Sequence, residues 1–306
     1  MTARLRRSCL AVPGSSAKML AKAASLAADQ VFLDLEDSVA AAEKTDATRQ
    51  QVVEALNGNQ WVAATKVVRV NGVRTPWCYQ DMIRVIEGAG NRVDCVMIPK
   101  VECSGDVEFV DRLLGQLEAQ LELERPIGLE VQIESPLGLS NIYDIARAST
   151  RIEALIFGPG DYAASAGMPQ LTVGATDPGY PGDQWHYVLS QILTAARASG
   201  LQAIDGPYAA IHDHAGFAEV ARRSRLLGFD GKWALHPGQI ALCNEIYSPS
   251  QAEFVRATEI LAAYSQATDS DRLGAVMLGS EMIDEASRKM AEQVVRRGQA
   301  AGLTGP

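Results

Sequence analysis

Charged side chains follow a series of short apolar runs in this sequence, at the positions where each run ends. They include Asp34, Glu36, Asp37, Arg69, Lys100, Glu134, Asp161 and Asp205. Carboxylates are hard oxygen ligands, and without a cluster of Cys and His they favour magnesium over zinc. If the runs are neighbouring strands, several acids and two cations meet at one mouth. The sequence therefore predicts a polar site that binds a divalent cation and an oxygen-rich ligand.

The histidines offer a weaker alternative. His212 and His214 stand two residues apart in a turn-like segment, as zinc ligands can, but the sequence shows no third ligand near them. We interpret this segment as a surface loop.

The apolar runs themselves predict the elements that hold the site. Each is rich in residues that favour strands, ends in polar, Gly or Pro residues and precedes an amphipathic stretch, which is the pattern of repeated β-α units. The expected strands are residues 8–13, 30–36, 66–71, 95–100, 127–134, 154–158, 201–205 and 232–236, and the clearest helices are 15–28, 43–56, 106–121 and 216–227. Eight units fit a TIM (β/α)8 barrel, whose active site lies at the carboxyl ends of the strands.

The chain continues beyond the eighth unit. We expect a barrel domain over residues 1–248 and a C-terminal helical extension that forms a lid over residues 249–306. In the extension, residues 251–265 and 283–297 are expected helices, and residues 266–272 an expected polar linker. Residues 167–182 are rich in Gly and Pro and are expected to form a loop over the top of the barrel.

Composition narrows the classes of protein. The chain has 306 residues, 47% of them hydrophobic, and a formal net charge of −9, which argues against nucleic acid as a main partner. Five cysteines without C-x-x-C spacing indicate reduced thiols. The N-terminal apolar stretch is too short for a signal peptide or a membrane span, so we expect a cytoplasmic protein without a membrane partner.

Seven of these segments, in order, resemble the HpcH/HpaI aldolase and citrate lyase β-subunit family, especially its free-standing malyl-CoA, β-methylmalyl-CoA and citramalyl-CoA lyases. The segments are Arg7-Ser8 before Val12-Pro13-Gly14, Asp34-Leu35-Glu36-Asp37-Ser38-Val39, Val68-Arg69-Val70-Asn71, Ile98-Pro99-Lys100, Ile133-Glu134-Ser135-Pro136, Phe157-Gly158-Pro159-Gly160-Asp161 and Ala234-Leu235-His236-Pro237-Gly238-Gln239. The resemblance covers about residues 6–290.

The resemblance implies that Glu134 and Asp161 bind Mg²⁺, with Mn²⁺ as an alternative ion. It implies that Arg69 contacts substrate oxygens and stabilises developing charge. Glu36 and Asp37 are expected to orient metal-bound water and Arg69 near the substrate. Each of these residues also has a purely structural explanation. Glu134 can be an acid at a helix N-terminus, Asp161 a turn residue, and Arg69 the partner of Glu36 or Asp37 in an ion pair.

Two further residues at strand ends, Lys100 and His236, are expected either to position substrate or to brace the rim. In the extension, Met282-Ile283-Asp284 resembles the lid of the malyl-CoA lyases, which implies that Asp284 is a catalytic acid/base acting on a neighbouring subunit's site. An ordinary helix N-cap is the competing explanation for Asp284. Gly279-Ser280 differs from the turn that relatives often carry there.

CoA is expected as part of the substrate. The family holds it near the first strand, so Arg7, Ser15 and Lys18 are candidates for phosphate contacts. For Lys18, an ordinary solvated helix charge is the favoured alternative. Segments 180–186 and 204–208 are more similar to the malyl-CoA lyases than to the citrate lyase β-subunit, which favours free CoA over an acyl-carrier protein.

These features predict a magnesium-dependent lyase that splits a malyl-CoA-like thioester into an acyl-CoA and a 2-oxoacid such as glyoxylate or pyruvate. The alternatives are an acyl-CoA thioesterase or malate-synthase-like condensing enzyme, an aldolase of 4-hydroxy-2-oxoacids that needs no CoA, and a non-catalytic subunit. We expect a homo-oligomer, a trimer or a hexamer.

Overall fold

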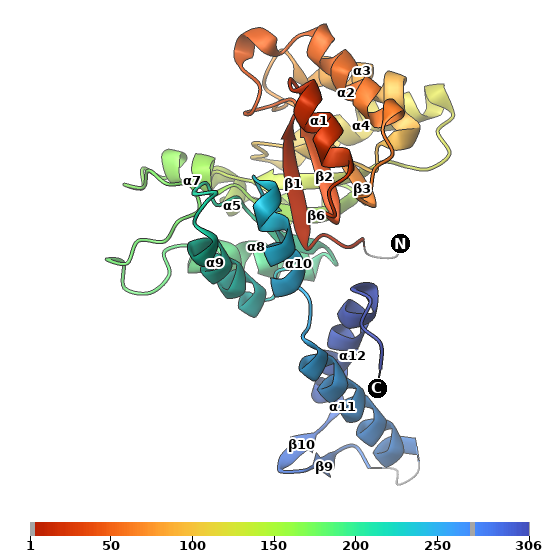
Figure 1. Ribbon diagram of the computed structural model, residues 1–306, viewed down its shortest axis with the longest axis vertical. Helices are drawn as coiled ribbons and strands as arrows, with labels where there is room; N and C mark the ends of the chain where they lie inside the picture. The colour runs from red at the N-terminus through yellow and green to blue at the C-terminus, as the bar shows by residue number, and fades with distance from the viewer. Residues whose placement is uncertain (1–3, 270–272, 306) are drawn as a thin grey trace. The chain divides into compact units, whose positions relative to one another are not determined.

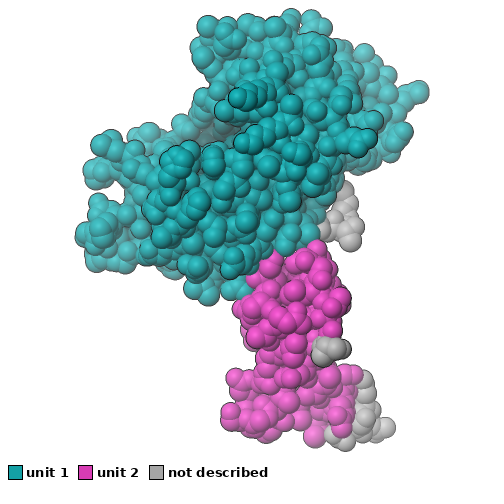
Figure 2. All heavy atoms as spheres, in the orientation of Figure 1, with its two compact units in different colours: residues 1–247 teal, residues 248–306 magenta. Residues whose placement is uncertain are grey.

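A computed structural model of the chain describes residues 4–269 and 273–305. It divides into two compact units, Met1–Tyr247 and Ser248–Pro306 (Figure 2). Each unit is described below by itself.

Eight parallel strands of the first unit close into a barrel, in which each strand pairs with the next and β8 pairs with β1 (Figure 1). The strands are β1 (Ser8–Pro13), β2 (Gln30–Asp34), β3 (Thr65–Arg69), β4 (Cys95–Ile98), β5 (Gly128–Ile133), β6 (Ile152–Phe157), β7 (Gln202–Asp205) and β8 (Gly231–Ala234). Each overlaps one of the eight expected runs. The expected TIM barrel is therefore confirmed.

Helices follow the strands and cover the outside of the barrel. They are α1 (Ala17–Ala24), α2 (Asp46–Gly58), α3 (Cys78–Ala89), α4 (Ser104–Leu121), α5 (Pro136–Ser140), α6 (Ile142–Ile145), α7 (Pro159–Ser165), α8 (His186–Ala198), α9 (His214–Leu227) and α10 (Ile240–Ile246), with short 3₁₀ turns at Ala41–Glu43, Gly90–Arg92 and Pro237–Gln239. Side-chain caps begin several of them: the hydroxyl of Ser135 accepts a hydrogen bond from the Gly138 amide at the start of α5. The residues between α7 and α8, which include the expected 167–182 loop, form no helix or strand.

Side chains that alternate along the strands divide the apolar core in two. Those that point inward include Phe32, Val67, Met97, Ile156 and Trp233, and they form one buried cluster. Those that point outward pack against the helices in a second, larger cluster. This period of two decides which strand-end residues face the barrel interior.

The second unit contains two helices, α11 (Gln251–Asp269) and α12 (Glu285–Ala300), and an antiparallel pair of short strands, β9 (Val276–Leu278) and β10 (Glu281–Ile283). The expected linker at residues 266–272 is wrong at its start, because α11 continues through Asp269. Ala267 is buried, so one face of this polar segment packs against neighbours and extends the helix. The remaining residues of that linker, 270–272, lie outside the described part.

Two properties of the described residues bear on the wider expectations. The cysteines Cys9, Cys78, Cys95, Cys103 and Cys243 are all free thiols. Within the described ranges, no helix has the length and apolar composition needed to cross a membrane.

Candidate functional site

A polar layer lies at the carboxyl ends of β2 to β6, above the apolar cluster inside the barrel. Asp34 stands two residues after Phe32, and Arg69 two residues after Val67, so both side chains point inward as those apolar residues do. The pairing of β2 with β3 sets Asp34 directly beside Arg69. Strand register therefore brings together groups that are 35 positions apart in the chain.

Arg69 is held from two sides. Its Nε and Nη2 atoms donate to the two carboxylate oxygens of Asp34, each at 2.6 Å, and its Nη1 lies 3.2 Å from Oε2 of Glu36. The rings of Phe32 and Trp233 lie below, with centroids 5.8 and 5.2 Å from the guanidinium carbon. Burial opposes the charged form, but the acids raise the pKa of Arg69 above its ordinary value. The cation is therefore permanent and fixed in direction.

Lys100 joins the acids on the other side of this layer. Its Nζ pairs with a carboxylate oxygen of Glu36, lies 2.9 Å from Oδ1 of Asp37, and lies 3.9 Å from Oδ1 of Asp161. The backbone of Lys100 adopts a left-handed conformation with φ of 53°, which is rare for a residue with a side chain. Such strain is typical of functional sites.

Glu134 is a buried acid of this layer, with 3% of its surface exposed. Its carboxylate accepts hydrogen bonds from the Lys100 amide at 2.5 Å and from Nε2 of Gln132 at 2.7 Å. Burial and then the charge of Asp161 raise the pKa of Glu134 to about 8. Gly158 leaves the space that this carboxylate needs, since a Cβ there would stand 2.5 Å from Oε2 of Glu134.

Glu36 lies between the two cations. Burial raises the pKa of Glu36 to about 7, although the positive charge of Arg69 acts to lower it. For Asp37, partial burial acts to raise the pKa, but hydrogen bonds with Glu36 and Lys100 hold it below its ordinary value. Asp37 forms its ion pair with Lys100 rather than with Arg69.

Glu134 and Asp161 line one cavity of about 300 Å³. Within the described residues no group of three or more His, Cys, Asp or Glu could hold a metal ion. Two carboxylates nevertheless fit magnesium, which takes few protein ligands and fills its other positions with water or substrate oxygens. A buried carboxylate with a raised pKa beside a second carboxylate is the environment that a divalent cation would stabilise.

The CoA candidates divide between the two ends of the barrel. Ser15 and Lys18 are exposed after β1, at the end that carries the polar layer, although Ser16 rather than Ser15 caps α1. Arg7 precedes β1 at the opposite end, where its Nη2 and Nε lie 2.7 and 2.8 Å from the carboxylate oxygens of Asp29. Arg7 therefore lies at the amino ends of the strands, and its contact with CoA stays a prediction.

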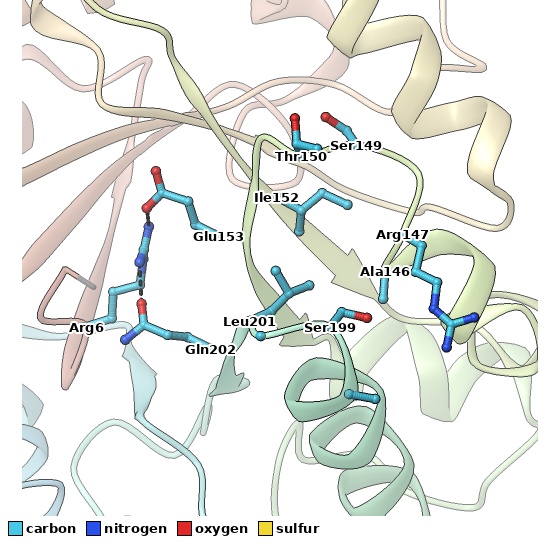
Figure 3. A pocket seen from close by; sticks show the side chains of 12 residues that line it. Arg6, Ala146, Arg147, Ser149, Thr150, Ile152, Glu153, Ser199, Leu201 and Gln202 are labelled. Carbon is cyan, nitrogen blue, oxygen red and sulfur yellow. Dashed lines mark hydrogen bonds and ion pairs between the residues drawn. The ribbon is translucent and has the colours of Figure 1, made fainter. Parts of the chain in front are cut away.

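A second cavity, of about 560 Å³, opens at those amino ends, beside Glu153 and Gln202 (Figure 3). The buried Arg6 guanidinium reaches it and lies 2.6 Å from Glu153, 2.7 Å from Glu130 and within hydrogen-bond distance of Gln202. These contacts close the bottom of the barrel with a paired cation. Residues at that face of TIM barrels serve stability rather than catalysis.

Asp284 lies in the second unit and caps α12. Its Oδ1 accepts hydrogen bonds from the Ser287 amide at 3.0 Å and from the Ser287 hydroxyl at 3.1 Å. These bonds lower the pKa of Asp284 from its ordinary value. The N-cap explanation is therefore correct for the local structure.

The histidines stay outside the polar layer. Nδ1 of His236 accepts a hydrogen bond from the Gly238 amide at 3.1 Å and begins a 3₁₀ turn, so it braces the rim. The rings of His212 and His236 are 6.0 Å apart between centroids.

Sequence reasoning placed Asp34 among the acids at strand ends but missed that it is the partner of Arg69. Its position two residues after the buried Phe32 was the available signal, because Glu36 and Asp37 already lie beyond the strand. It also missed Gln132 as a partner of Glu134.

Residues 7–237 match the family described as HpcH/HpaI aldolase/citrate lyase. The chain belongs to this family. Among members, it is 40% identical to L-malyl-CoA/beta-methylmalyl-CoA lyase of Cereibacter sphaeroides, over 97% of this chain and 96% of that one. It is 34% identical to the citrate lyase subunit beta of Escherichia coli, over 98% and 95% of the two chains.

A solved structure of the family is similar over nearly the whole chain. It is CitE of Mycobacterium tuberculosis in complex with magnesium, acetoacetate and coenzyme A, which is 29% identical, has a TM-score of 0.76, and covers 95% of this chain and 97% of its own.

Proposed function

We propose that this protein is a magnesium-dependent CoA-ester lyase that splits a malyl-CoA-like 3-hydroxyacyl-CoA into an acyl-CoA and a 2-oxoacid. One observation carries the proposal: Glu134 and Asp161 line one cavity with Lys100, at the barrel end where Arg69 is fixed in the polar layer. The relatives named as malyl-CoA lyases, which match nearly the full length, support the class of reaction.

Glu134 and Asp161 are the proposed protein ligands of Mg²⁺. When bound, the ion polarises the oxygens of the substrate's hydroxyl and carboxylate groups. The magnesium complex of the Mycobacterium tuberculosis relative supports this choice of ion.

Arg69 is proposed to stabilise negative charge that develops on substrate oxygens during cleavage. Asp34 fixes the Nε edge of the guanidinium, and the aromatic rings lie beneath it, so reorientation during the reaction is small. Lys100 is proposed to position the substrate, with Glu36 and Asp37 holding its ammonium.

Asp284 is proposed to carry the proton to and from the acyl-CoA enolate. We propose that the second unit acts as a lid on a neighbouring subunit of a homo-oligomer, a trimer or hexamer, in the cytoplasm. Arg7, Ser15 and Lys18 are the proposed CoA contacts.

The direct test is turnover. Purified protein with Mg²⁺ is expected to release a 2-oxoacid from malyl-CoA, β-methylmalyl-CoA or citramalyl-CoA, and EDTA is expected to stop the release. Absence of release from all three esters, or release that EDTA leaves unchanged, would refute the proposal.

Two measurements separate the alternatives. A thioesterase or a malate-synthase-like enzyme liberates free CoA, so a thiol assay during turnover distinguishes it from a lyase. A CoA-independent aldolase splits 4-hydroxy-2-oxoacids, which an assay without CoA detects. A non-catalytic subunit is inactive in both.

A further inference from the structure

Among the described residues that line the cavity beside Glu134 and Asp161, Gly72 is the one without a side chain. Gly72, Val73, Arg74 and Thr75 form one wall of it in the loop after β3. Lys100, Glu102, Ser135 and Ser165 line the cavity as well. A cavity of about 300 Å³ is larger than a glyoxylate unit needs, so it has room for a carbon substituent.

The loop that carries Gly72 is held in place. The Gly72 carbonyl accepts hydrogen bonds from the Thr75 amide at 2.9 Å and from the Thr75 hydroxyl at 2.7 Å. The preceding Asn71 is bonded to Asp81 and to the Leu35 carbonyl. The wall therefore has a defined position, and the space in front of it is a property of the fold.

Glycine at position 72 is not required by backbone or packing. Its φ is not positive, and a Cβ added there would stand 3.9 Å from both Cβ of Lys100 and Cγ2 of Thr75, which is ordinary contact. At Gly158, by contrast, a Cβ would stand 2.4 Å from Cβ of Glu134, so the fold excludes a side chain. A side chain at position 72 would therefore fit, and it would occupy space beside Lys100 and Thr75, which line the same cavity.

We propose that Gly72 determines substrate size: the absence of a side chain at this position leaves room for a methyl group on the carbon skeleton that is split. This inference rests on the proposed function, because the cavity must hold the substrate beside Glu134 and Asp161. The methyl group can stand on the acyl side, as in β-methylmalyl-CoA, or on the oxoacid side, as in citramalyl-CoA. A side chain at position 72 competes with either one for the same space.

The test compares Gly72→Ala with wild type on malyl-CoA, β-methylmalyl-CoA and citramalyl-CoA. The ratio of kcat/KM for a methyl-bearing ester to kcat/KM for malyl-CoA is expected to fall about tenfold or more, the usual effect of one carbon in a close-fitting pocket. If the ratio falls for only one of the two methyl-bearing esters, position 72 faces the side of the substrate that carries the methyl group in that ester. Thr75→Ser keeps the hydroxyl but removes Cγ2 from the wall, and is expected to raise the same ratio.

Gly58→Ala is the matched control, since Gly58 is an exposed glycine of α2 with nothing within 4 Å of an added Cβ. It is expected to leave the ratio unchanged. An unchanged ratio in both wall variants, or an equal fall in Gly58→Ala, overturns the inference.

A binding measurement separates this inference from the proposed function. With Mg²⁺ present, glyoxylate, pyruvate and 2-oxobutyrate are tested for their effect on Tm. If wild type splits none of the three esters, the proposed function fails. In that case, a loss of pyruvate and 2-oxobutyrate binding but not of glyoxylate binding in Gly72→Ala still supports the inference that Gly72 determines ligand size. Equal losses for all three ligands overturn that inference.

Discussion

At the scale of single residues, the carboxylates of the polar layer have different environments and hence different tasks. Glu134 is buried, faces Asp161, and has a pKa raised to about 8. Asp34 is equally buried, but Arg69 holds its pKa below the ordinary value against the effect of burial. The first acid is suited to bind a cation from solution, and the second already has one within the protein.

Removal of one proposed metal ligand is expected to stop the reaction. Glu134→Gln keeps the shape of the side chain but removes its charge, so we expect both activity and Mg²⁺ affinity to fall by about 100-fold or more. Turnover and calorimetric titration with Mg²⁺ measure the two effects. Glu124→Gln, at an exposed acid, is the control and is expected to behave as wild type. Unchanged Mg²⁺ affinity in Glu134→Gln would exclude this residue as a ligand.

The ion pair between Asp34 and Arg69 is expected to contribute to the free energy of unfolding. Asp34→Asn leaves Arg69 buried with a weakened partner, so we expect a loss of about 3 kcal/mol in the free energy of unfolding at pH 7. The lowered pKa of Asp34 means that its contribution is present above the unfolded-state pKa of about 4 and is lost as pH falls through the folded-state value.

The difference between wild type and Asp34→Asn should therefore shrink as pH falls from 7 toward 3, which urea unfolding at several pH values measures. Asp144→Asn, at an exposed acid of α6, is the control. A difference that is the same at all pH values would show that the carboxylate charge is not its source.

At the scale of elements, the start of α12 combines a cap with a proposed acid/base. Asparagine caps helices as well as aspartate does, but it cannot transfer the proton, whereas alanine does neither. We expect kcat to fall about 100-fold or more in both Asp284→Asn and Asp284→Ala, and the melting temperature to fall only in Asp284→Ala. Turnover and thermal unfolding of the same samples separate the two roles. Full activity in Asp284→Asn would mean that Asp284 is a cap alone.

At the scale of the whole molecule, the chain has two compact units, and the proposed ligands and the proposed acid/base are on different ones. If the lid of one subunit serves the barrel of another, inactive variants should complement each other. Glu134→Gln mixed and reassembled with Asp284→Asn is expected to regain activity, because about a quarter of randomly formed sites then combine an intact barrel with an intact lid.

Size-exclusion chromatography of the mixture gives the oligomeric state, and turnover gives the recovered activity. Each variant reassembled with itself is the control and should remain inactive. A mixture that forms oligomers but stays inactive would show that lid and barrel of the same chain work together.

The barrel could be predicted from the sequence because local signals define its parts. Strand residues alternate or form short apolar runs, and polar residues such as Glu134 and Asp161 directly follow them. A closed parallel barrel then places every strand end at one rim, so the set of site residues follows from eight local patterns. The resemblance to a family added the roles of those residues, which the patterns alone do not provide.

Tertiary structure alone decided how these residues pair. Asp34 meets Arg69 because β2 and β3 align at that register, and Arg7 lies at the far end of the barrel because it precedes its strand rather than following it. The extension of α11 through the expected linker depends on packing around Ala267. Local sequence determines which elements form, but ion pairs and helix ends depend on contacts between distant segments, whose free energy exists only in the folded chain.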